Sequence, residues 1–97
     1  MKRLVITVPA LAEAAAAREH YAQIRPELAA EFSAELSRAL QWVQSHPLAW
    51  APIGRRARRR LLNRFPYAAI YRIEADCIRV VALMHQRQRP GYWRGRR

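Results

Sequence analysis

The chain has 97 residues, 52% of them apolar, which is typical of one globular domain spanning residues 1–97 and not of a disordered segment. It has no uninterrupted run of about 18 apolar residues, so no membrane-spanning helix is expected. The single cysteine, Cys77, excludes an intramolecular disulfide and fits a reducing compartment, so we expect a cytoplasmic protein.

The net charge of +11 is concentrated in the second half of the chain. Residues 1–53 carry five cationic side chains and five glutamates, so their charges cancel. Residues 54–97 carry thirteen arginines against Glu74 and Asp76, and the difference of eleven accounts for the whole net charge. Such an electropositive half suits nucleic acid or an acidic protein segment as a partner.

The first half of the chain predicts one strand followed by two helices. Alternating apolar residues predict a strand over residues 2–8, and an alanine-rich segment predicts a helix over residues 9–23 that begins with a proline. A second proline breaks this helix and starts another over residues 26–44, in which apolar residues recur every three to four positions. The two helices should form a hairpin.

The second half predicts a loop and then strands. We expect residues 48–54 to form a loop and residues 55–65 a strand rich in arginine. Residues 67–73 alternate as a strand does, and residues 77–85 are nearly all apolar, which is typical of a central strand. The prediction is an α+β fold of order βααβββ, with an N-terminal strand, a helical hairpin packed on one face, and a three-stranded antiparallel sheet. Residues 94–97 should be frayed.

The order of these elements, with the stretch RRRLLNRFPYAAIYRIEADCIRVVALMHQRQRPGYW over residues 58–93, resembles the RelE/ParE superfamily of toxins from bacterial type II toxin–antitoxin pairs. The elements FPY, IYRI, IRVVA and the final YW are similar to the ParE-like branch. The resemblance implies a toxin made with an antitoxin whose C-terminal segment wraps and neutralises it. RelE-like members cut messenger RNA on the ribosome, whereas ParE-like members inhibit DNA gyrase and are not nucleases.

The sequence offers candidate residues for most of the chemistry that a nuclease needs. His85 could act as acid or base, since its ordinary pKa lies near neutrality. Arg87 and Arg89 could clamp phosphate, and Tyr92 or Trp93 could stack on bases. Metal-independent RNA cleavage also needs a second group for proton transfer.

That second group is missing from the sequence. RelE-like nucleases place Lys or Glu on the strands that correspond to residues 55–65, where this chain has neither. Arginine is a poor base because it does not lose its proton in proteins. We therefore expect a toxin that acts by binding DNA gyrase, without cofactor or metal. A ribosome-dependent endoribonuclease is the alternative, and a basic binding module without toxicity is a third reading.

The binding reading assigns contact roles to arginines and aromatic residues. The candidates for contact with the target or nucleic acid are Arg58, Arg60, Tyr92 and Trp93. The candidates for antitoxin binding are Arg55, Arg56, Arg59, Trp42 and Trp50. Each has a purely structural alternative: His85 could serve only as a hydrogen-bonding residue, Trp93 could cover the sheet, and the arginines could protect a sheet edge from aggregation.

Overall fold

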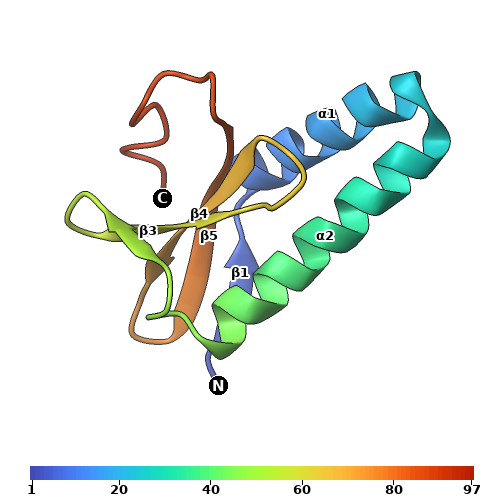
Figure 1. Ribbon diagram of the computed structural model, residues 1–97. Coiled ribbons are helices and arrows are strands. Elements are labelled where there is room, and N and C mark those ends of the chain that lie inside the picture. Colours follow the sequence, from blue (N-terminus) through green and yellow to red (C-terminus); the bar gives the residue numbers. More distant parts are fainter.

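The computed structural model describes all residues, 1–97, and is drawn in Figure 1. The elements in chain order are β1 (Arg3–Ile6), α1 (Val8–Ile24), α2 (Pro26–Ser45), β2 (Ala51–Ile53), β3 (Ala57–Leu61), β4 (Tyr67–Ile73) and β5 (Cys77–His85). The α+β class is confirmed, and the helices and the last two strands lie where periodicity predicts them. Neither helix is long and apolar enough to cross a lipid bilayer.

The sheet differs from the prediction of three antiparallel strands, which was wrong. It has five strands in the order β1-β5-β4-β3-β2, and β1 runs parallel to β5 while the other pairs are antiparallel. The helical hairpin joins the two edge strands, β1 and β2, and the connection from β1 to its parallel neighbour β5 contains both helices and the other three strands. Strand β2 lies within residues 48–54, where a loop was expected. It could not be predicted because three residues that include a proline are too few to show strand periodicity. Strand β3 ends at Leu61, four residues earlier than expected.

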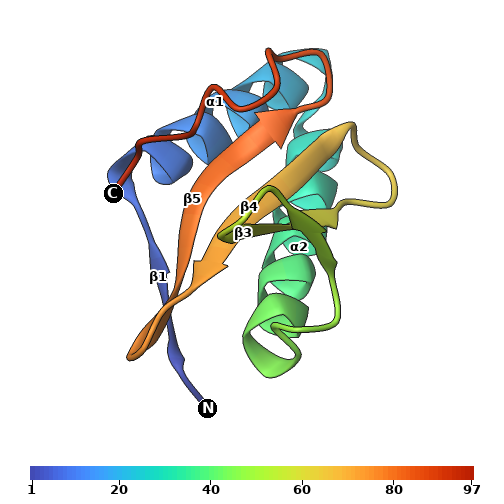
Figure 2. The ribbon, with the colours of Figure 1, turned by 90° about the vertical axis from the view of Figure 1, so that its left-hand side faces the viewer.

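The two faces of the sheet are covered by different parts of the chain. Both helices pack on one face, and the segment after β5, residues 86–97, crosses the other (Figures 1 and 2). On the helix face, Phe32 and Tyr71 are among the largest fully buried side chains. On the other face, Trp93 packs against Ala57 and Ile70. We call residues 86–97 the tail and this second face the tail face.

A β-bulge in β5 places consecutive apolar residues of this strand on the two faces of the sheet. Tyr71 is paired with Val80 and Ile70 with Ala82, so Val81 is an extra residue in the ladder. Val80 belongs to the core beneath the helices, while Val81 and Ala82 pack with the tail. Consecutive apolar residues in this strand are therefore all buried, as expected for a central strand.

A buried carboxylate on α2 fixes the loop between β3 and β4. Glu35 is only 6% exposed, and its Oε2 accepts hydrogen bonds from the backbone N–H groups of Asn63 and Arg64. Buried carboxylates are uncommon unless they are hydrogen-bonded in this way. The bonds hold residues 62–66 against the helix, where Phe65 packs on Phe32 with ring centres 5.3 Å apart.

Candidate functional site

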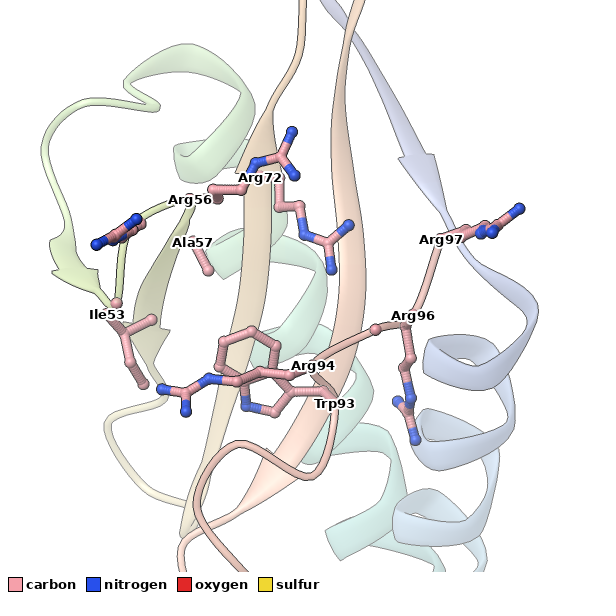
Figure 3. Close-up of a pocket in the computed structure, with 11 residues that line it drawn as sticks. Ile53, Arg56, Ala57, Arg72, Trp93, Arg94, Arg96 and Arg97 are labelled. Atoms are coloured by element: carbon pink, nitrogen blue, oxygen red, sulfur yellow. The ribbon is translucent and has the colours of Figure 1, made fainter.

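An open cleft of about 530 Å³ lies on the tail face of the sheet, between the β2–β3 turn and the tail (Figure 3). Its walls come from three segments that are distant in sequence: the turn, strand β4 and the end of the tail. The lining residues are Ile53, Gly54, Arg55, Arg56, Ala57, Arg72, Trp93, Arg94, Gly95, Arg96 and Arg97. We call it the arginine cleft.

The arginine cleft is lined by six arginines and by no aspartate or glutamate. Only Arg96 forms an ion pair within the chain, with Glu13. The other five have no carboxylate within 4 Å, so most of their charge is left for an external partner. The adjoining hollow includes Glu74, but this carboxylate is hydrogen-bonded to Arg79 at 2.9 Å.

The tail wall of the cleft is anchored by a glutamate on α1. Glu13 accepts hydrogen bonds from the backbone N–H of Leu83 at 3.0 Å, the Tyr92 hydroxyl at 2.7 Å and the Arg96 guanidinium at 2.9 Å. Burial, together with the hydrogen bond to Glu13, raises the pKa of Tyr92. The tail is therefore not frayed as expected, because Arg96 is tied to both α1 and β5.

The opposite wall is a tight turn that depends on a glycine. Gly54 has φ of +72°, in the left-handed region that side chains disfavour, and it places Arg55 and Arg56 at the tip of the β2–β3 turn. Both arginines are exposed. Figure 3 shows Arg56 on the turn side and Arg94 on the tail side of the same opening.

The structure separates the arginines of β3 by the face they occupy. Arg58 donates to the backbone oxygens of Leu48 and Trp50, at 3.3 and 2.7 Å, and the guanidinium carbon of Arg60 lies 4.4 Å from the centre of the Trp50 ring. Both are half-buried on the helix face, where they hold the α2–β2 connection in place. Arg59 is exposed on the tail face, in register with Ile70 and Ala51.

The three tryptophans have different environments. Trp93 is 3% exposed and packs against the sheet, so its ring is not available for stacking on bases. Trp50 is half-buried beneath Arg60. Trp42 is 52% exposed on α2, with its ring centre 5.1 Å from that of His46. Of the three, Trp42 alone presents a large apolar surface to a partner.

An apolar groove runs between the two helices, on the opposite side of the molecule from the arginine cleft. It has a volume of about 360 Å³, and eleven of its fourteen lining residues are hydrophobic. Leu11 and Ala15 of α1 face Leu36 and Leu40 of α2 across it, and the sheet closes its base at Leu83 and neighbouring residues. The molecule thus has one strongly basic hollow and one apolar hollow.

Comparison with known proteins identifies the family. The family model described as the ParE toxin of the type II toxin–antitoxin system, parDE, matches residues 4–90. The chain belongs to the ParE toxin family. A solved structure described as the chromosomal ParDE TA system from P. aeruginosa aligns with a TM-score of 0.78 at 24% identity, over 88% of this chain and 96% of that one. That likeness confirms the fold. No curated protein sequence matches the chain.

In this ParE toxin, His85 ends β5 within a set of structural contacts. Its Nδ1 accepts a hydrogen bond from the backbone N–H of Arg87 at 3.0 Å, and its backbone N–H donates to the Gln88 side chain at 2.7 Å. The ring lies edge-on to Tyr67, with ring centres 4.9 Å apart. Burial raises the pKa of Tyr67, so this phenol stays protonated at neutral pH and offers no base.

The other groups around His85 do not complete an acid–base pair. Arg87 and Arg89 are exposed and form no ion pair with a carboxylate. Glu13 reaches β5 at Leu83, but its oxygens are occupied by three donors. The geometry of this ParE toxin therefore supports a binding surface better than a nuclease site.

A small cluster of potential metal ligands lies at the β4–β5 turn. One ligand atom each from Glu74, Asp76 and Cys77 lie within 4.8 Å of one another. The hydrogen bond from Arg79 lowers the pKa of Glu74 and occupies its carboxylate, and burial raises the pKa of the Cys77 thiol. The cluster is accounted for by the ion pair between Glu74 and Arg79 beside a buried thiol.

Sequence reasoning missed the contributions of Arg72, Arg94, Arg96 and Arg97 to the cleft, and the anchoring role of Glu13. Arg72 could have been placed from alternation, because it shares a face of β4 with Ala68 and Ile70 and not with Tyr71. The tail could not, because no periodicity marks a segment whose position depends on contacts of Tyr92 and Arg96 with a glutamate far away in the sequence.

Proposed function

We propose that this ParE toxin inhibits DNA gyrase by binding it and is neutralised by a cognate antitoxin, in the cytoplasm of a bacterium. The observation that carries the proposal is the arginine cleft, in which five arginines have no carboxylate partner. His85 lies outside the cleft, at the end of β5, and no second proton-transfer group accompanies it. Such a surface is suited to holding a partner and not to breaking a bond.

The gyrase proposal is tested with the purified toxin in a DNA supercoiling assay. We expect inhibition that rises with toxin concentration and is accompanied by accumulation of cleaved DNA. The same preparation added to a translating extract should leave messenger RNA intact. Rapid message cleavage that is lost in His85→Ala, with supercoiling unaffected, would establish the endoribonuclease alternative in place of this proposal.

We propose that the antitoxin places an amphipathic helix in the apolar groove between α1 and α2. Leu11 is 51% exposed and lines the groove with Leu36 and Leu40, and an exposed apolar groove is the usual receptor for such a helix. Trp42, exposed on the same helix as Leu40, would extend this contact.

The antitoxin proposal is tested with two matched substitutions on α1. Leu11→Arg places a charge in the groove, whereas Ile24→Arg places one at a residue that is 59% exposed and lies outside the groove. We expect Leu11→Arg to remain toxic but to escape rescue by the co-expressed antitoxin, and Ile24→Arg to be rescued normally. Equal rescue of both variants would show that the antitoxin binds elsewhere.

A further inference from the structure

We propose that the arginine cleft binds the sugar–phosphate backbone of double-stranded DNA, so that the toxin contacts the nucleic acid as well as the enzyme that acts on it. The choice of DNA rests on the proposed function, because gyrase works on a DNA duplex. The phosphate chemistry of the site is argued from the cleft itself.

The cleft offers hydrogen-bond donors and positive charge, with almost no side-chain acceptors. Every polar side chain that lines it belongs to an arginine or to Trp93, and both residue types only donate. A phosphodiester backbone carries only acceptor oxygens at its phosphates, and the planar guanidinium matches phosphate geometry in a bidentate manner. A peptide would bring backbone N–H groups as well, and these side chains could not accept from them.

The arginine cleft has no exposed aromatic ring, which favours a duplex over a single strand as its ligand. Proteins that bind single-stranded nucleic acid stack the bases on accessible aromatic side chains. Here Trp93 is 97% covered, and the hydroxyl of Tyr92 is tied to Glu13. The cleft is therefore equipped to contact a backbone and not to receive unstacked bases, which is how proteins bind a duplex without reading its sequence.

The arginines lie on both sides of the cleft, so a DNA backbone lying in it could contact several of them at once. Figure 3 shows Arg56 on the turn, Arg94 on the tail and Arg72 on β4 between them, and Arg55 is a further lining residue from the turn. An open, charged cleft of this kind suits a strip of polyanion better than an enclosed small molecule.

The test compares two double variants of the toxin that have the same net charge. Arg55→Gln with Arg56→Gln removes two exposed arginines from the cleft, and Arg25→Gln with Arg38→Gln removes two exposed arginines from the helical hairpin, outside both hollows. The affinity of each for a fluorescent DNA duplex is measured by anisotropy over a series of salt concentrations. We expect the cleft variant to bind the duplex about tenfold more weakly than wild type. The slope of the logarithm of its binding constant against the logarithm of the salt concentration should be smaller by roughly two, while the affinity and slope of the control stay near wild type.

The outcomes separate this inference from the proposed function. If both variants lose DNA affinity equally, binding is diffuse and the cleft has no special role, whether or not gyrase is inhibited. If the cleft variant loses affinity for the antitoxin and keeps its DNA affinity, the cleft is a protein site and the inference is overturned. If wild-type toxin binds the duplex through the cleft but leaves supercoiling unaffected, the DNA site stands and the gyrase proposal fails.

Discussion

Removal of the Glu13 carboxylate should destabilise the fold and release the tail. Glu13 is 19% exposed as a side chain and Arg96 is 24%, and the carboxylate also accepts from Tyr92 and from the backbone of Leu83. In Glu13→Ala, all three donors lose their acceptor at once.

The expected cost follows from these contacts. Breaking a buried ion pair by removing one partner costs about 3–5 kcal/mol, and the remaining exposure of both side chains places this pair at the lower end. We therefore expect Glu13→Ala to lower the free energy of unfolding by about 3 kcal/mol. That is a large part of the roughly 5–15 kcal/mol typical of a domain, and it corresponds to a fall in Tm of roughly 15 °C.

The measurement is urea unfolding followed by tryptophan fluorescence, with Glu19→Ala as the control. Glu19 is exposed on the same helix and forms no ion pair, so its replacement should cost less than about 0.5 kcal/mol. Glu13→Gln keeps one acceptor oxygen and should fall between the two. Limited trypsin digestion gives a second readout, because the released tail should be cut at Arg94 sooner than in wild type.

The reasoning would be refuted if Glu13→Ala were no less stable than Glu19→Ala and its tail were cut at the wild-type rate. That result would mean that the packing of Trp93 on the sheet holds the tail by itself. It would also remove the argument that the tail wall of the arginine cleft depends on α1.

Three other substitutions have defined expectations. Glu35→Ala should lower the free energy of unfolding by about 2 kcal/mol, because two backbone N–H groups lose a buried acceptor, and hydrogen exchange should show faster exchange at Asn63. Burial raises the pKa of Tyr71 from 10.0 to about 12, so the folded state holds this proton more tightly and the associated stability is complete below pH 10 and lost as the pH rises towards 12. In Tyr71→Phe, the urea midpoint of unfolding should fall less steeply between pH 10 and pH 12 than in wild type. An unchanged pH dependence of the midpoint would contradict the assignment of this loss of stability to Tyr71. Gly54→Ala should cost about 1–2 kcal/mol through its positive φ alone, since the nearest atom to an added Cβ is 3.7 Å away, and Gly54→Asn should cost less in the same urea assay.

The helices and the last two strands could be predicted because their signals are local. The apolar residues of α2 recur every three to four positions, and β4 and β5 show alternation and continuous apolar character within single segments. The sheet order could not be predicted in the same way. Whether β1 stands beside β5 is decided by pairing across 74 positions, and no local pattern in residues 3–6 specifies a partner.

The candidate site could be predicted in part, where local sequence signals indicate it. Composition alone indicated a basic surface, and Arg55 and Arg56 do line the cleft. Strand alternation, applied strictly, would have separated Arg58 and Arg60 from Arg59 and shown that the run of arginines cannot act as one surface. The tail was beyond reach, because its position depends on contacts between residues 79 and 83 positions apart.

The central position of β5 has a consequence for protein synthesis. The strand that pairs with both β1 and β4 is the last one to be translated, and the tail that completes the arginine cleft follows it. Domains emerge from the ribosome N-terminus first, so the sheet cannot close until β5 has been translated. A polypeptide interrupted before Cys77 would have neither a paired central strand nor the second wall of the cleft. Completion of the cleft is therefore coupled to completion of the sheet during synthesis.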